Sequence, residues 1–305
     1  MSNALRIGTR GSALALWQAN ETSRLLRALG FKTEIVTIKT TGDRRRDVPL
    51  ASIGGKGLFV KELEEALMRF EIDLAVHSLK DVPSIIPDEF VLAGFLERAD
   101  PRDAWLQAYR LPIDALPRGA VIGTSAPRRR SQLFERYPHL RIAEVRGNVE
   151  TRIARMNELD YDGVVLAAAG LTRLGLEAEI TSYFSVDDLI PAAGQGIIGL
   201  ETLRRNAFAR DAAAAITHAP SELAARCERG VLQQFGERLD CNSPIAVHAS
   251  IDGGEITVRA FLSDYDGTSA LRVKRRGTEA DDLVRAVGRD LIALGALELL
   301  EVCTV

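Results

Sequence analysis

The chain has 305 residues, 46% of them hydrophobic, and a formal net charge of −3. This length and apolar content allow two or three domains with substantial cores. The net charge excludes a polycation that binds nucleic acid through its overall charge. No apolar run is long enough to span a bilayer, and no secretory h-region follows Met1. We therefore expect a soluble cytoplasmic protein.

The first two thirds of the chain alternate short apolar runs with helical patterns, which is typical of an α/β domain. Strands are predicted at residues 5–9, 33–39, 72–77, 120–123, 141–145 and 163–168. Helices are predicted at residues 12–29, 57–69, 127–136 and 149–159.

Polar residues follow the carboxyl ends of these strands, where ligands of open α/β sheets bind. They are Arg10 and Ser12, then Ser78, Lys80 and Asp81, then residues 124–129, Arg146 and Arg173. The two sets predict two lobes that face each other across a cleft. The chain is expected to cross between them near residues 100–103 and again near 191–196.

The pattern changes from about residue 221. A helix at residues 222–235 precedes three β runs at 245–251, 255–263 and 269–276, and a closing helix is predicted at 280–299. Turn sequences separate the β runs. This predicts a separate α+β domain with a three-stranded antiparallel sheet.

The segment 121–134 combines several anion-binding features. Ser125 is expected to cap a helix that starts at Pro127, and Arg128 and Arg129 lie in its first turn. Cations at a helix N-terminus oppose the helix dipole, so such an arrangement is expected to hold an anion. The alternative is a solvated basic helix start.

Two glycine motifs resemble nucleotide sites only weakly. The GxGxxG pattern at 194–199 follows no apolar strand, and the loop at Gly54, Gly55, Lys56 and Gly57 lacks the first glycine and the Ser or Thr of a phosphate-binding loop. We interpret the latter as a lid before a helix.

Cysteine chemistry is concentrated at one position. Cys227, Cys241 and Cys303 show no CxxC spacing, which argues against a disulfide framework or a zinc site, and the histidines have no metal-ligand spacing. Cys227 fits a helix core, whereas Cys241 is predicted on a loop. A thiolate there could attack a carbon electrophile and form a thioether.

Eight motifs in order resemble one known family. They lie at residues 6–19, 54–63, 75–83, 98–104, 123–129, 146–152, 169–175 and 191–196. The stretch 75–83, for example, reads Ala-Val-His-Ser-Leu-Lys-Asp-Val-Pro. On these motifs the chain resembles the porphobilinogen deaminase (hydroxymethylbilane synthase) family along essentially its whole length.

The resemblance implies three domains. Domain 1 (residues 1–98 and 197–216) and domain 2 (102–192) would be lobes like those of type II periplasmic binding proteins, with doubly wound mixed sheets. Domain 3 (220–305) would be the α+β domain. The implied activity is that of a monomeric transferase of tetrapyrrole and haem biosynthesis. It would join four porphobilinogen molecules head to tail, with loss of ammonia, into hydroxymethylbilane.

The resemblance also implies site residues. Cys241 would carry a dipyrromethane cofactor through a thioether, and Asp81 would stabilise the cation left when ammonia departs. The cofactor acid groups would be bound by Ser78, Lys80, Thr124, Ser125, Arg128, Arg129 and Arg146. Substrate would be bound by Arg10, Ser12, Phe59, Arg146, Arg152, Arg173 and Gln195. No metal, nucleotide, nucleic acid or membrane partner is implied.

One departure concerns the cofactor cysteine. The family usually places two glycines before it, whereas Leu239 and Asp240 precede Cys241 here. This reduces backbone freedom, and the Asp240 charge is expected to raise the pKa of the thiol.

Two other classes of function stay open on the residues alone. One is a two-lobed binding protein for a small polyanion, which gives Cys241 and Asp81 no role. The other is a nucleic-acid-binding protein that uses the Arg128 patch, against which the net charge of −3 argues.

Overall fold

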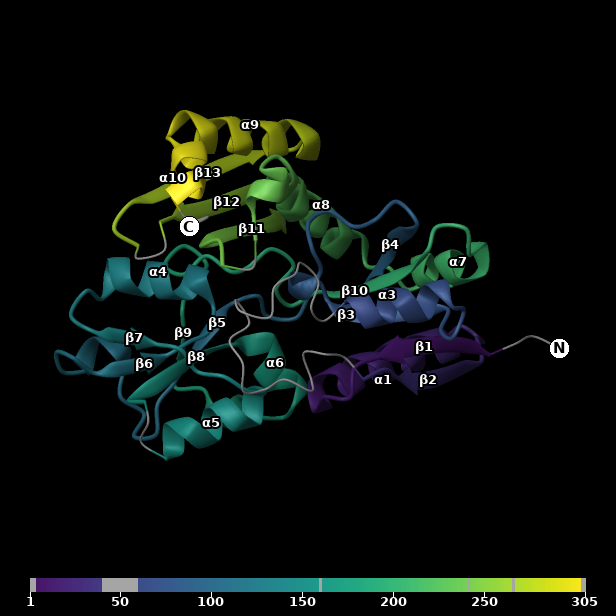
Figure 1. The fold of residues 1–305 in the computed structure, drawn as a ribbon, viewed down its shortest axis with the longest axis horizontal. Coiled ribbons are helices and arrows are strands. Elements are labelled where there is room, and N and C mark those ends of the chain that lie inside the picture. The colour runs from purple at the N-terminus through teal and green to yellow at the C-terminus, as the bar shows by residue number, and fades with distance from the viewer. Residues whose placement is uncertain (1–3, 40–59, 159–160, 241, 265–266, 303–305) are drawn as a thin grey trace. The chain divides into compact units, whose positions relative to one another are not determined.

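Two units make up the chain, and each is described by itself. The computed structural model describes residues 4–39, 60–158, 161–240, 242–264 and 267–302 (Figure 1). One unit consists of Met1–Ala99 with Gly196–Ala225, and the other of Asp100–Gln195 with Arg226–Val305.

The first unit is built on a five-stranded mixed sheet with the order β2-β1-β3-β10-β4. Its strands are β1 (Leu5–Thr9), β2 (Thr33–Thr37), β3 (Leu74–Ser78), β4 (Phe90–Phe95) and β10 (Ile198–Leu203). The first three are parallel, whereas β10 is antiparallel to both of its neighbours. The register places Ser78, the last residue of β3, opposite Ile198 at the start of β10.

Helices cover both faces of this sheet. α1 (Ala13–Ala28) and α7 (Ala207–Ala215) share a core with Leu5, Ile7 and Leu200. α3 (Lys61–Met68) packs on the opposite face. Figure 1 shows α1 beside β1 and β2. Ser12 begins α1 because its hydroxyl oxygen accepts the Ala15 N–H at 3.3 Å, which satisfies one donor of the first turn.

The second unit repeats this topology in its larger sheet, with the order β7-β6-β8-β5-β9. The strands are β5 (Asp103–Leu106), β6 (Val121–Gly123), β7 (Arg141–Ala143), β8 (Gly163–Ala167) and β9 (Ser182–Tyr183). β6, β7 and β8 are parallel, and β5 is antiparallel to β8 and β9. α4 (Pro127–Arg136) covers one face, and α5 (Val149–Asn157) and α6 (Ala168–Arg173) cover the other.

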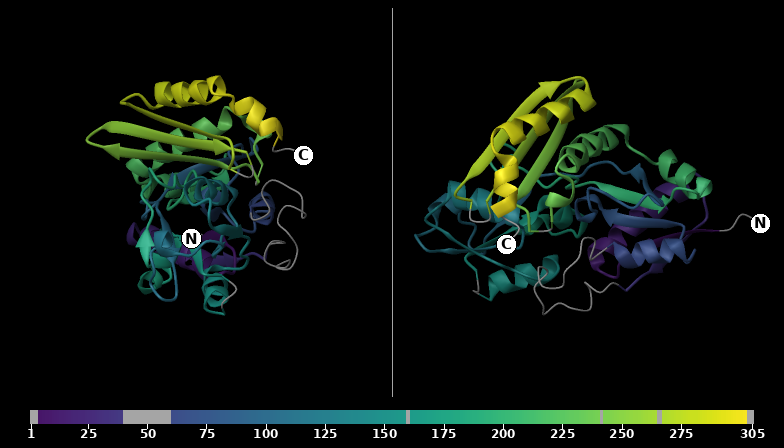
Figure 2. Two further views of the ribbon diagram at one scale, coloured as in Figure 1. Left: turned by 90° about the vertical axis from the view of Figure 1, so that its left-hand side faces the viewer. Right: turned by 45° about the horizontal axis from the view of Figure 1, so that its top comes forward.

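A three-stranded antiparallel sheet completes the second unit. Its strands are β11 (Ile245–Asp252), β12 (Glu255–Ser263) and β13 (Ala270–Gly277), followed by α9 (Ala280–Ala293) and α10 (Ala296–Val302). α8 (Ala219–Gln233) precedes them and belongs to this unit from Arg226 onward. Figure 2 shows α9 along one face of the sheet. On the other face Phe261 and Ala246 pack against Ile190, and Arg259 pairs with Asp187 at 2.7 Å.

The predicted fold class is confirmed: two mixed α/β sheets and a C-terminal three-stranded antiparallel sheet are present. Four strands, β4, β5, β9 and β10, were missed. β10 escaped the pattern because Glu201, a fully buried carboxylate, interrupts its apolar run. The single closing helix was wrong. α9 ends at Ala293, and Gly295 takes a φ of 100° before α10 begins.

Three titratable side chains lie between α3 and the sheet: Glu64 on α3, His77 on β3 and Glu201 on β10. His77 Nε2 is 3.0 Å from Glu201 Oε2, and both side chains are buried. Within the described ranges Glu201 Oε1 has no hydrogen-bond partner. Burial, followed by the nearby Glu201 carboxylate, raises the pKa of Glu64 on α3 to about 7, although His77 opposes the shift.

The raised pKa predicts how stability depends on pH. The folded chain favours the protonated Glu64 carboxyl, so the contribution of this group is fully present below 4.5, the unfolded value, and is lost as pH rises through about 7. Glu64→Gln mimics the neutral acid and should remove this loss. Between about pH 5 and about pH 8 the wild type should lose ~1–2 kcal/mol relative to the variant, since solvent screening reduces the ~3 kcal/mol that the shift represents.

Urea unfolding at several pH values measures this difference. Glu65→Gln is the matched control, because Glu65 forms an exposed pair with Arg69 on the same helix. Parallel stability curves for the wild type and Glu64→Gln would contradict the prediction.

Candidate functional site: a buried carboxylate between two arginines

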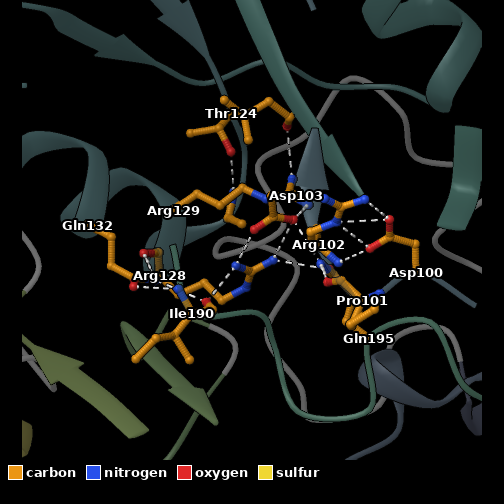
Figure 3. A network of polar contacts seen from close by, with 12 residues as sticks. Asp100, Pro101, Arg102, Asp103, Thr124, Arg128, Arg129, Gln132, Ile190 and Gln195 are labelled. Carbon is orange, nitrogen blue, oxygen red and sulfur yellow. Dashed lines mark hydrogen bonds and ion pairs between the residues drawn. The ribbon is translucent and has the colours of Figure 1, made fainter. Parts of the chain in front are cut away.

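The second unit contains a buried ionic cluster centred on Asp103 (Figure 3). Asp103 is the first residue of β5 and has no exposed surface. Arg128 Nη1 and Nη2 donate to its two oxygens at 2.6 and 3.1 Å, and Arg129 Nη2 donates at 2.7 Å. Both arginines come from the first turn of α4 and are themselves buried. Two guanidinium groups therefore share one carboxylate, which leaves a net charge of about +1.

The cluster fixes the ionised state of its carboxylate. Burial alone would raise the pKa of Asp103, but the charges and hydrogen bonds of Arg128 and Arg129 outweigh it and hold the pKa well below the usual range. Asp103 is thus an anion throughout the range in which proteins function.

Gln195 hydrogen-bonds to both Asp103 and Arg128 of the cluster. Its side-chain amide donates to Pro101 O at 2.7 Å and to Asp103 Oδ1 at 2.8 Å. Its amide oxygen accepts from Arg128 Nη2 at 3.1 Å. The Gln195 side chain thereby ties the segment before β5 to the start of α4.

The two arginines differ in what they still have to offer. The four terminal N–H groups of Arg128 meet Asp103 twice, Ile190 O and Gln195 Oε1. Arg129 donates through its terminal nitrogens to Val165 O and Asp103 only. Its Nε is buried and has no partner in the part of the chain that the structure describes. Since a guanidinium carries five N–H donors, Arg129 retains capacity for a further acceptor.

The start of α4 differs from the sequence prediction in two respects. Pro127 is the first helical residue, as predicted, but the N-cap is Ala126, which has no side chain to cap with, so the cap predicted at Ser125 is wrong. Thr124 supplies the local bond instead, because its Oγ1 accepts the Ala126 N–H at 3.3 Å. Arg128 and Arg129 were expected to bind an anion, and they bind the Asp103 carboxylate of the chain itself. Asp103 was not among the predicted site residues.

Other predicted residues of this unit lie at helix ends. Arg146 is half-buried and pairs with Glu144 at 2.6 Å. Arg152 Nε donates to Gly147 O at 2.9 Å, close to the N-terminus of α5. Arg173 is the last residue of α6 and is buried.

In the first unit the predicted residues gather at the carboxyl end of β3. Ser78 Oγ accepts from Gln18 Nε2 at 2.8 Å, which ties this end of the strand to α1. The chain then turns through a short 3-10 helix, Leu79–Asp81. There Lys80 and Asp81 are exposed to solvent. Arg10 and Ser12 follow β1, the parallel neighbour of β3. Phe59, the proposed lid at Gly54, Gly55, Lys56 and Gly57, and Cys241 lie outside the described residues.

The residues on both sides of Cys241 form a hydrogen-bonded turn. Asp240 Oδ1 accepts the Asn242 N–H at 2.9 Å and the Ser243 hydroxyl at 2.9 Å. Ser243 Oγ accepts the Asp240 N–H at 3.0 Å. Leu239 is buried and anchors the start of this turn. The Asp240 side chain thus links the residue before Cys241 to the two residues after it.

Two absences concern the described ranges only. There, no three His, Cys, Asp or Glu side chains are grouped so that they could hold a metal ion. None of the helices in these ranges combines the length and apolar character needed to cross a membrane.

Comparison with known proteins gives full-length matches. A family model described as "Porphobilinogen deaminase, dipyromethane cofactor binding domain" matches residues 5–211, and one described as "Porphobilinogen deaminase, C-terminal domain" matches 223–293. The porphobilinogen deaminase of Acidithiobacillus ferrooxidans is 44% identical over 303 residues, 99% of this chain and 98% of the relative. That of Geobacter sulfurreducens is 45% identical over 302 residues, 98% of this chain and 94% of the relative.

Among solved structures, the methionine binding protein MetQ aligns with a TM-score of 0.45 and 13% identity, covering 71% of this chain and 90% of MetQ. A methionine-binding lipoprotein of Bacillus subtilis aligns with a TM-score of 0.44 and 13% identity, covering 70% and 90%.

The cluster predicts a large effect of neutralising Asp103. Asp103→Asn leaves two buried guanidinium groups without their anion and should destabilise the chain by about 3–5 kcal/mol. Asp100→Asn is the control, because Asp100 pairs with Arg102 at 2.6 Å in a partly exposed setting. The control should lose at most ~1 kcal/mol. Urea unfolding of both variants tests this, and equal losses would contradict a special role for Asp103.

Proposed function

This chain belongs to the porphobilinogen deaminase family, and we propose that it joins four porphobilinogen molecules head to tail, with release of ammonia, into the linear tetrapyrrole hydroxymethylbilane. The relationship over nearly the whole chain supports this activity. The observation that carries the proposal to specific residues is the buried cluster around Asp103. It has a net positive charge, and among the described residues the Nε of Arg129 has no partner. Each porphobilinogen ring carries an acetate and a propionate, so the ligands of this enzyme are polyanions.

The second unit fits the acid groups of a dipyrromethane. Arg129 has N–H donors available, and Arg128 holds Asp103 and Gln195 in place beside it. A carboxylate that accepts from Arg129 would give its buried Nε a partner, at a gain of roughly 1.5–3 kcal/mol for a charged hydrogen bond. Thr124, Ser125 and Arg146 are proposed to complete this binding surface. Ser78 and Lys80 of the first unit are also proposed to bind cofactor acid groups. When bound, the dipyrromethane supplies the pyrrole carbon to which substrate units are added.

Substrate recognition is assigned to a second set of residues. We propose that Arg10, Ser12, Phe59, Arg146, Arg152, Arg173 and Gln195 bind porphobilinogen or the growing chain. Guanidinium groups suit this role because their planar forks match carboxylates in two-point contacts. We also propose that the protein works as a monomer. Its three domains would be residues 1–98 with 197–216, residues 102–192 and residues 220–305.

Asp81 is proposed to act on the reacting substrate. Its carboxylate follows β3 and is exposed, so a substrate can reach it. Loss of ammonia from porphobilinogen leaves a cationic methylene-pyrrole. A carboxylate about 4 Å away stabilises that cation by roughly 4 kcal/mol at an effective dielectric near 20. Because the charge develops only as ammonia leaves, this attraction lowers the barrier rather than the energy of the bound substrate.

Intact mass tests the cofactor assignment. The chain purified from a porphobilinogen-producing host should exceed its sequence mass by two deaminated pyrrole units, and Cys241→Ala should not. Cys227→Ala is the matched control, since Cys227 is buried and burial raises the pKa of its thiol to about 11. It should keep the added mass. Bare sequence masses for both the wild type and Cys241→Ala would overturn the assignment and favour a polyanion-binding protein.

Removing the Asp81 charge tests the catalytic assignment. Asp81→Asn should lower kcat about a thousandfold with a small change in KM, because the lost attraction arises in the transition state. Steady-state formation of hydroxymethylbilane measures this. Asp88→Asn, at an exposed carboxylate farther along the same segment, should leave kcat unchanged. A rise in KM at constant kcat would instead assign Asp81 to ground-state binding.

A further inference from the structure

Glu228 is a second fully buried carboxylate of the second unit, and it lies on α8. Its Oε2 accepts the Gly194 N–H at 2.6 Å, and its Oε1 accepts the Ala249 N–H at 2.7 Å. His248 Nδ1 lies 3.4 Å from the same Oε1. Burying a carboxylate costs several kcal/mol unless hydrogen bonds compensate, so an apolar residue would fill this core position at a lower cost in free energy. Two charged hydrogen bonds to separate backbone segments indicate a geometric role.

One of these segments is the turn that carries Gln195. Gly194 directly precedes Gln195 and has a φ of 74°, which few residues other than glycine adopt. The Gln195 N–H donates to Ala192 O at 3.0 Å, so the turn is tight. The Glu228 carboxylate holds the amide of Gly194 and thereby fixes the point from which the Gln195 side chain starts.

Gln195 has no exposed surface and uses both ends of its amide. It donates to Pro101 O and Asp103 Oδ1 and accepts from Arg128 (Figure 3). Hydrogen bonds weaken steeply when donor and acceptor lose their alignment. A displaced turn would therefore disturb the orientation of Asp103 and, through it, that of Arg129.

We propose that Glu228 is a positioning residue that acts through Gln195 on the Asp103–Arg128–Arg129 cluster. α8 ends at Gln233, shortly before the loop of Cys241. Glu228 thus fastens the helix that leads to the cofactor cysteine to the turn that orders the arginines. The inference rests on the proposed function, because its effect on the protein is the rate at which the cofactor is acquired.

A double-mutant cycle tests this role. The full-length apoprotein, produced without porphobilinogen, is mixed with porphobilinogen, and cofactor loading is followed by intact mass. In Glu228→Gln the amide NH₂ can accept from neither backbone N–H, so one of the two bonds is lost. We expect loading to slow about tenfold in Glu228→Gln and at least as much in Gln195→Ala. If Glu228 acts through Gln195, the double variant should be no more than about twofold slower than Gln195→Ala.

Three results would overturn the inference. One is loading of Glu228→Gln at the wild-type rate. Another is a double variant whose loading rate is reduced by the product of the two single reductions. That result would give Glu228 a structural role independent of Gln195. A wild-type chain that acquires no mass would overturn the proposed function itself, and the inference with it. Glu222→Gln, at an exposed position on α8, is the control and should load like the wild type.

Should Glu228→Gln not fold, hydrogen exchange of the wild-type holoenzyme decides the question. A Gly194 amide bonded to Glu228 should exchange at least about a hundredfold more slowly than an unprotected amide. Exchange at the unprotected rate would overturn the inference.

Discussion

The ion pair of Asp103 with two arginines is the constraint on which the second unit depends. It joins the first residue of β5, the first turn of α4 and, through Val165 O, the strand β8. A buried carboxylate with one guanidinium often contributes little net stability, because desolvation offsets the attraction. With a second guanidinium the cluster keeps a positive charge after the pair is satisfied. The same atoms can therefore hold the strands in register and attract a ligand anion.

Two further buried carboxylates, Glu201 and Glu228, contact the residue directly before a proposed site residue. In the first unit the Glu201 carboxylate lies 3.0 Å from the imidazole Nε2 of His77, which immediately precedes Ser78. In the second unit Glu228 binds the amide just before Gln195. In each case the neighbouring residue, rather than the carboxylate, is the one proposed to meet ligand. Apolar side chains could fill the same volume, but they would leave backbone and imidazole groups free to reorient.

The sequence predicts the order of the main strands and helices, because their apolar periodicity is strong. It also singles out Arg128 and Arg129, since cations at a helix start need an explanation. It could not identify Asp103 as their partner, because that residue is distant in the chain and stands in a segment that reads as a crossing. A charged residue followed by the apolar run Ala104 to Leu106 was the available signal. Gln195 was singled out only by the family resemblance, as a substrate-binding residue, since an isolated glutamine between glycines has no pattern of its own. Its hydrogen bonds to Asp103 and Arg128 were not predicted.

Leu239 and Asp240 precede Cys241, and Asp240 supplies side-chain hydrogen bonds where glycine would supply backbone freedom. Two glycines allow a tight turn through backbone freedom, whereas Asp240 stabilises one through its side chain, which accepts from Asn242 and Ser243. These hydrogen bonds restrain the residues on either side of Cys241, which should lower the entropy lost on attachment of a ligand there. Asp240 also directly precedes Cys241 in the sequence, and an anion next to a thiol is expected to oppose formation of the reactive thiolate. These two effects act in opposite directions on attachment. Asp240→Gly should therefore favour the thiolate of Cys241 and, at the same time, remove the hydrogen bonds that restrain the neighbouring residues.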